Sequence, residues 1–192
     1  MTVDAIQLTT EALKGLLETT IGAGEIFVGP PFEQGAAAAS ASLFLYHLVP
    51  NADLRNEPRL EGLRSGGPTN TGEHDSIPFD LRYLITVFRP TSPIGGGSPV
   101  ELLRLGQIIQ TLHATPVLTG ARLPGQTARL TPDPLSMEEI SRVWGLFPET
   151  AYQTSVVYLA TPVFVDASPV PVGPRVREAH RRVGDWQEAA AG

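Results

Sequence analysis

Residues 135–166 constrain the fold of this chain more than any other segment, because one short stretch carries a helix start, a helix stop and a long strand. Ser136 is followed three residues later by Glu139, the spacing of a helix capping box. Four apolar residues then recur on one helical face: Met137, Ile140, Val143 and Trp144. Pro148 ends this helix, and β-branched and aromatic residues dominate from Tyr152 onward. The segment contains no nucleophile beside a general base, so its pattern predicts burial and pairing.

Two further stretches predict strands that are apolar on both faces, residues 41–49 and 79–89. In the first strand, Leu43, Leu45 and His47 are expected on one face, with Phe44, Tyr46 and Leu48 on the other. This strand is expected to be central in its sheet. In the second strand, one face is expected to hold Phe79, Leu81, Tyr83, Ile85 and Val87.

Helices are predicted at residues 4–20 and 98–113. Gly22 and Gly24 stop the first helix. The second helix has Ser98 as its predicted cap, Pro99 at its first position and Glu101 at its third. Its apolar stripe is expected to be Leu102, Leu105, Ile109 and Leu112, widened by Ile108. Short strands are predicted at residues 25–28 and near residues 127–130.

The order helix, strand, strand, long loop, strand, helix, helix, strand indicates an α+β fold. We expect a mostly antiparallel, mixed sheet packed against two or three helices. The chain has 192 residues, which is enough for one domain with a sizeable core. We expect that domain to span residues 1–174, with residues 175–192 as a C-terminal tail.

Composition and motifs argue against several function classes. The net charge of −6 argues against a nucleic-acid partner, and the absence of cysteine excludes thiolate metal sites. No apolar run is long enough to span a membrane, and the first residues lack the basic leader of a signal peptide. We therefore expect no membrane partner.

The remaining candidates for chemistry are weak. His47 is interpreted as a core or interface residue. His113 lies in the last turn of a predicted helix, where an imidazole interacts favourably with the helix dipole. Residues 95–98 precede a helix and resemble a phosphate-binding loop, but Pro99 stands where that loop needs lysine. We expect no enzyme, no catalytic residue, no cofactor and no metal, and keep a small-molecule-binding domain as a less favoured alternative.

Five blocks occur together in a consistent order: SLFLY (42–46), PNADLRN (50–56), PFDLRYLIT (78–86), PLSMEEISRVW (134–144) and YLATPV (158–163). From about residue 3 to 174 the chain resembles the Pvc16 N-terminal domain (DUF4255) family. These are tail-terminator or cap proteins of extracellular contractile injection systems, the phage tail-like particles of the Photorhabdus virulence cassette and antifeeding prophage type. Some members of the family continue beyond this domain.

The resemblance implies a structural role. Such a protein forms a homo-hexameric ring at the distal end of the inner tube and sheath, where it terminates polymerisation and links the two. Its implied partners are itself, the inner tube protein and the sheath protein. It is expected to assemble in the cytoplasm as part of a phage tail-like particle, which either is released or acts inside the producing cell. A tail-completion protein of a phage or prophage is the alternative.

Two groups of residues are candidates for the interfaces of such a ring. Leu54, Arg55 and Asn56 are expected at the start of an ordered loop near an interface, with a local turn on their own domain as the alternative. Four arginines make a basic cluster in an otherwise acidic chain: Arg175, Arg177, Arg181 and Arg182. They are candidates for docking onto an acidic tube or sheath surface, with a solvated tail as the alternative.

Overall fold

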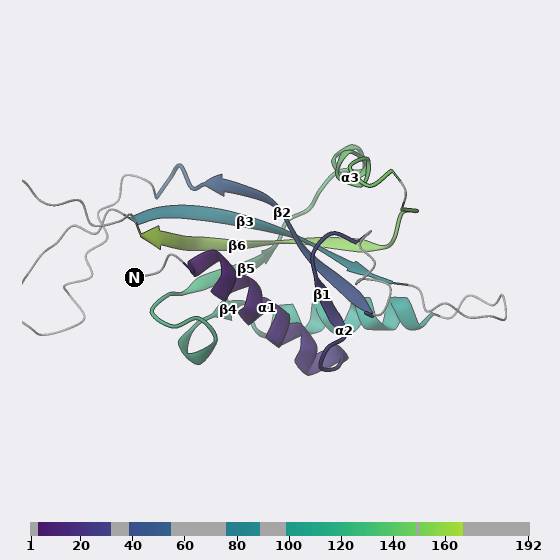
Figure 1. Cartoon of the computed structure of the whole chain (residues 1–192), viewed down its shortest axis with the longest axis horizontal. Helices are drawn as coiled ribbons and strands as arrows, with labels where there is room; N and C mark the ends of the chain where they lie inside the picture. Colours follow the sequence, from purple (N-terminus) through teal and green to yellow (C-terminus); the bar gives the residue numbers. More distant parts are fainter. Residues whose placement is uncertain (1–3, 32–38, 55–75, 89–98, 149, 167–192) are drawn as a thin grey trace, which may run out of the picture.

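Figure 1 shows the computed structural model, which describes residues 4–31, 39–54, 76–88, 99–148 and 150–166. The described elements are three α-helices, six strands and one 3₁₀ turn. In chain order they are α1 (Ala5–Ile21), β1 (Ile26–Val28), β2 (Ala41–Pro50), β3 (Ser76–Val87), α2 (Val100–Ala114), β4 (Val117–Leu118), η3 (Gly120–Arg122), β5 (Ala128–Pro132), α3 (Met137–Trp144) and β6 (Ser155–Asp166).

The six strands form one sheet in the order β1-β2-β3-β6-β5-β4. Every pair is antiparallel except β1 with β2. The predicted α+β class with a mixed, mostly antiparallel sheet is therefore confirmed. The centre of the sheet is the long pair β3–β6. β2 lies next to this pair and is hydrogen-bonded to β1 and to β3, so residues 41–49 form an interior strand, as predicted. The two edge strands are very short, which limits unwanted pairing with other chains.

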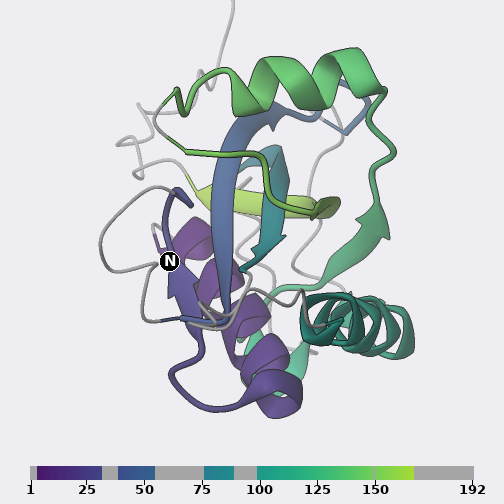
Figure 2. The ribbon, with the colours of Figure 1, turned by 90° about the vertical axis from the view of Figure 1, so that its right-hand side faces the viewer.

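Helices α1 and α2 cover one face of the sheet, and α3 lies over the other (Figure 2). On the first face, the predicted side of β3 is confirmed: Leu81, Tyr83, Ile85 and Val87 are buried, and Phe79 is half-buried against them. α1 contributes Leu13 and Leu17, which are also fully buried. Gly22 and Gly24 follow α1 at positive φ angles of 129° and 77°, which glycine alone adopts without strain, so the predicted stop is confirmed.

The alternation predicted for β2 fails at its middle. Leu45 pairs with Tyr83, but His47 pairs with Arg82, so Tyr46 is an extra residue in a β-bulge. The bulge turns His47 to the face opposite Leu45. His47 is exposed there, which makes the prediction of a core histidine wrong; its place at an interface stays a prediction.

On the second face, the predicted capping box of α3 is confirmed. The Glu139 amide donates to Ser136 Oγ at 3.2 Å, and the Ser136 amide donates to the Glu139 carboxylate at 2.8 Å. Hydrogen bonds from the Ser136 backbone and hydroxyl lower the pKa of Glu139. Trp144 packs with Phe147 against the sheet, whereas Met137 is 77% exposed, so its predicted place on the buried face is wrong.

The helix predicted at residues 98–113 is confirmed, with two differences. Its first residue is Val100, and Pro99 rather than Ser98 occupies the cap position, with no side-chain cap bond. Ser98 itself lies outside the described residues. His113 lies in the last turn, as predicted. The two-residue strand β4 was not predicted, because a strand this short leaves no alternation to detect.

Candidate assembly surfaces

Leu54, the first of the sequence-predicted interface residues, lies in a local turn. Its amide donates to Asn51 Oδ1 at 3.0 Å, and the Asn51 side-chain amide donates to Asp80 Oδ1 at 2.9 Å. The Asn51 backbone amide also donates to the Pro78 carbonyl oxygen at 2.8 Å. These bonds fix the turn on its own sheet. The place of Leu54 at an interface stays a prediction. Arg55 and Asn56 lie outside the described residues.

The arginine cluster, Arg175, Arg177, Arg181 and Arg182, also lies outside the described residues. The last described residue, Asp166, pairs with Ser76 at the start of β3. The turn at Asn51 contacts β3 two residues further along, at Pro78. The structure thus brings to one end of the sheet the two points, Leu54 and Asp166, from which the two predicted interface segments continue.

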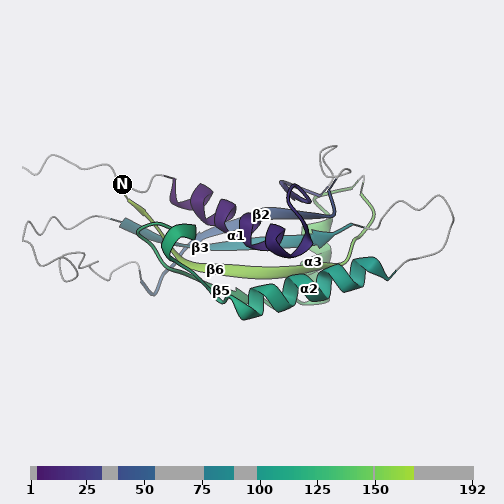
Figure 3. The same ribbon diagram turned by 90° about the horizontal axis from the view of Figure 1, so that it is seen from below.

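A different surface stands out on α2. Its last half packs on α1, where the hydroxyls of Thr20 and Thr111 lie 2.7 Å apart. Because Thr20 is in the last turn of α1, the first half of α2 extends past that helix (Figure 3). Its outward side is apolar, with Leu102 57% and Leu103 63% exposed.

We call this side the α2 outer surface; it consists of Leu102, Leu103, Gly106 and Ile109. The predicted core stripe of α2 is therefore partly wrong: Ile108 and Leu112 are buried, whereas Leu102 and Ile109 face solvent. A cluster of exposed aliphatic side chains is typical of a protein contact surface.

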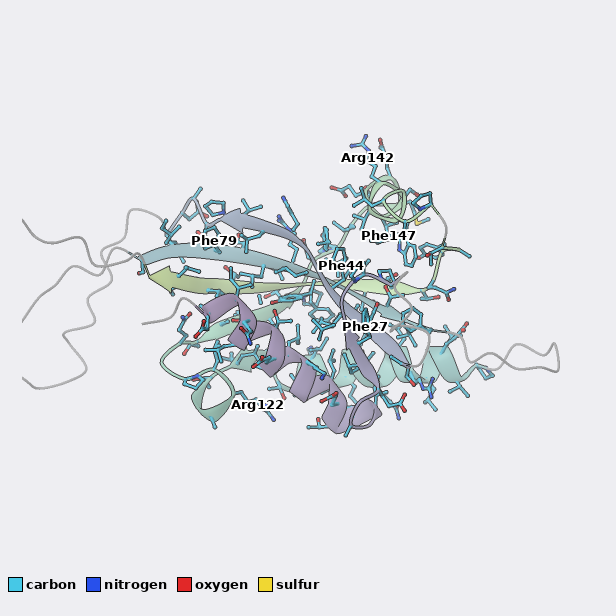
Figure 4. All side chains as sticks on the ribbon, in the orientation of Figure 1. Phe27, Phe44, Phe79, Arg122, Arg142 and Phe147 are labelled. Atoms are coloured by element: carbon cyan, nitrogen blue, oxygen red, sulfur yellow. The ribbon has the colours of Figure 1, made fainter. Side chains whose placement is uncertain are left out.

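An open groove lies between α1 and η3, with a volume of about 450 Å³. Its lining is apolar and small, with one acidic and one basic side chain: Leu8, Glu11, Ala12, Gly15, Leu16, Ala121, Arg122 and Pro124. A Cβ atom added to Gly15 would meet no other atom within 4 Å, so the groove is open above this glycine. Figure 4 labels Arg122 at the lower edge of the ribbon beside η3, to the left of the first turn of α2.

The second face of the sheet carries a polar cluster with a structural role. Arg82 Nε donates to Asp133 Oδ2 at 2.7 Å, and its Nη1 lies 3.3 Å from His47 Nδ1. The hydrogen bond to Asp133 raises the pKa of Arg82. The Asp133 amide donates in turn to the Val157 carbonyl at 3.0 Å. These bonds hold the segment before α3 against the centre of the sheet.

Tyr83 is a buried titratable residue on the face of the sheet that α1 covers. The Tyr83 hydroxyl lies 2.8 Å from Thr10 Oγ1, and burial raises its pKa to about 12, so it stays protonated at ordinary pH. Within the ranges that the structure describes, no three side chains of His, Cys, Asp or Glu gather as a metal site would require. Residues 95–98, the weak phosphate-loop candidate, lie outside those ranges. Across the same ranges, no helix combines the length and apolarity needed to cross a membrane.

Comparison with known proteins identifies relatives of one kind. The family model described as the Pvc16 N-terminal domain matches residues 8–178. Among solved structures, the fold is similar to the PVC sheath/tube terminator of an extracellular contractile injection system in its extended state. The TM-score is 0.58 at 17% identity, covering 97% of this chain and 66% of that chain.

The fold is also similar to the tube-terminating cap of the anti-feeding prophage, with a TM-score of 0.54 and 18% identity. That alignment covers 90% of this chain and 59% of the cap. The chain therefore spans less than two thirds of the length of each of these two structures. A comparison with curated proteins finds no match.

Proposed function

The chain belongs to the Pvc16 N-terminal domain family, and from this premise we propose that it caps the end of the tube and sheath of a contractile injection system. One observation carries the proposal: the fold of a sheath/tube terminator extends over 97% of this chain. Proteins of this role act by occupying a polymer end, which requires complementary surfaces and no catalytic group.

We propose that the chain does so as a homo-hexameric ring that terminates polymerisation. A closed ring needs head-to-tail interfaces, in which one protomer presents two different surfaces. A stable interface of this kind buries about 800 Å² on each partner. The α2 outer surface supports the proposal, because its exposed aliphatic side chains are suited to burial between protomers.

In this proposal, the chain contacts the tube and sheath through the end of the sheet at which Leu54 and Asp166 lie. Two interface segments continue from that end, one containing Arg55 and Asn56 after Leu54, the other containing the four arginines. We propose that residues 1–174 form the terminator domain and that residues 175–192 dock its arginines onto an acidic tube or sheath surface. Assembly takes place in the cytoplasm of the producing cell.

The function is tested by locating the chain on particles. A tagged chain is added to tube and sheath assembled from the tube and sheath proteins of the same organism. Gold label on the tag is then mapped by negative-stain microscopy. Label confined to one end of each particle is expected. Label spread along the sheath, or absent from every particle, contradicts the proposal.

The arginine cluster is tested in the same assay by charge reversal. Replacing Arg175, Arg177, Arg181 and Arg182 with glutamate should strongly reduce end labelling, because the charges would then repel an acidic partner. Replacement by lysine keeps the charge and is the matched control. Undiminished end labelling with the glutamate variant would show that the four arginines do not dock the chain onto the tube or sheath.

A further inference from the structure

We propose that residues 167–174 of a neighbouring copy of this chain add a strand to the outer edge of β2. The inference rests on the proposed ring and names one contact that would build it. The occupant of the edge is a second copy of the chain, held by main-chain hydrogen bonds between strands.

The outer edge of β2 is only partly covered. β1 pairs with residues 41–43 of β2 and ends at Val28. Pro30 and Pro31 follow shortly after, and because proline has no amide hydrogen they interrupt any further pairing of this segment. Within the described ranges, no strand lies beside residues 44–50 on that side of β2 (Figure 1).

The uncovered edge carries main-chain groups that are directed away from the sheet. The Asn51 amide donates to the Pro78 carbonyl oxygen on β3. Main-chain groups alternate between the two sides of a strand, so those of Leu48 and Pro50 are expected on the outer side. The side chain of Leu48 is also 40% exposed. An edge of this kind is a template for pairing with another chain.

Residues 167–174 read ASPVPVGP, and this pattern suits a strand that pairs on one side only. Pro169 and Pro171 alternate with Val170 and Val172. In an extended strand the amides of the two valines point to one side, whereas the other side has prolines, which lack an amide hydrogen. The valine side can pair with β2, and the proline side offers no amide donors to a further strand. Such a strand closes the edge that it covers.

The segment is too short to place both valines on the β2 edge of its own chain. Pro50 is level with Phe79 and Val163, and Asp166 lies three residues further along β6. A strand added to β2 lies three strand spacings from β6, so Asp166 is roughly 17 Å from the place beside Pro50. The four residue steps from Asp166 to Val170 span at most about 14 Å. A neighbouring copy is not bound by this limit.

The contact has the form that a closed ring requires. Each copy gives residues 167–174 to one neighbour and accepts the same segment of another neighbour on β2, so the two surfaces of a protomer differ. The family match extends to residue 178 and includes this segment. Residues 175–192, with the four arginines, stay available for the tube and sheath.

Site-directed cross-linking tests the contact, and the chain suits it because it contains no cysteine. The Leu48→Cys and Val172→Cys variants are prepared separately and treated with a short bismaleimide, in solution and on capped particles. Neither variant alone should cross-link, whereas their mixture should yield a dimer and the double variant a ladder that ends at six. Val117→Cys is the matched control: Val117 is 38% exposed and lies on the opposite edge strand, β4, so it should yield no dimer with Val172→Cys.

Three outcomes would overturn the inference. A double variant that cross-links only within one chain would show that the segment lies on its own β2. Equal cross-linking through Val117→Cys would show random collision, and no cross-link of the mixture, in solution or on particles, would place the segment elsewhere. Failure of the proposed function reads out differently: a cross-linked ring that never labels particle ends contradicts the capping role and leaves this contact in place.

Removing the amide donors gives an independent measurement. The double change Val170→Pro and Val172→Pro keeps the segment apolar but deletes both donors, so self-association in analytical ultracentrifugation should weaken at least about tenfold. The double change Pro169→Val and Pro171→Val keeps the donors and should associate at least as tightly as the unaltered chain. Both changes lie outside the described sheet, and circular dichroism checks that the fold persists. A folded chain with four successive prolines that associates as strongly as the unaltered chain would refute the added strand.

Discussion

Replacing Tyr83 with phenylalanine should change the pH dependence of stability in a defined window. Tyr83 is fully buried between α1 and the sheet, and its hydroxyl bonds with Thr10 at 2.8 Å. Burial raises its pKa from 10.0 to about 12. Because the protonated form is neutral, the folded state keeps its proton at pH values where the unfolded chain has lost it. Stability contributed by Tyr83 is therefore complete below pH 10 and is lost as the pH rises through about 12.

The size of the effect follows from these two values. At about pH 11 the unfolded group lies one unit above its pKa and the folded group one unit below, which amounts to roughly a tenfold difference, or about 1.4 kcal/mol. At about pH 9 the same difference is close to zero. Between these two pH values the unaltered chain should therefore lose about 1.3 kcal/mol more stability than Tyr83→Phe.

Urea unfolding of both proteins at pH 9 and 11, followed by circular dichroism, measures this difference. Tyr46 and Tyr158, whose pKa values burial also raises, are present in both proteins and cancel in the comparison. At pH 9 the variant should be less stable by only about 1 kcal/mol, since Thr10 keeps its bond to the Ile6 carbonyl. If both proteins lose the same amount of stability between pH 9 and pH 11, Tyr83 is not the buried neutral group described above.

Three further predictions concern local structure. Ser136→Ala should weaken α3 by about 1 kcal/mol and speed amide exchange there, whereas Ser136→Thr should not. Gly15→Ala should raise the stability by about 1 kcal/mol, because Gly15 lies in a helix with open space beside it. Gly22→Ala should lower the stability, because the φ angle of Gly22 is 129°. Melting temperatures equal to that of the unaltered chain would contradict both predictions. Breaking the partly exposed Arg82–Asp133 pair with Asp133→Asn should cost no more than about 1 kcal/mol, and a larger loss would show that the pair is more than a surface ion pair.

Local signals in the sequence predicted the elements that depend on near neighbours. The capping box at Ser136 and Glu139 needs only its own turn, and the structure has it. The face of β3 that carries Tyr83 follows from strict alternation in a strand buried on both sides. The glycines after α1 stop it through their own backbone geometry.

The features that escaped prediction depend on partners distant in sequence. The bulge at Tyr46 exists in the pairing of β2 with β3, so nothing within residues 41–49 reveals that His47 changes face. α3 lies over a small patch around Leu84, too narrow to cover Met137. The exposure of Leu102 depends on where α1 ends, and the groove exists only because η3 returns beside α1. Both surfaces are thus products of tertiary packing.

The length distribution of assembled particles tests the central claim most directly. Tube and sheath proteins are assembled with and without the chain, and particle lengths are measured by electron microscopy. If the chain terminates polymerisation, its omission should give longer and more variable particles, and adding it back should restore a narrow distribution. Particles of the same length and uniformity in its absence would contradict the claim that this protein caps the tube and sheath.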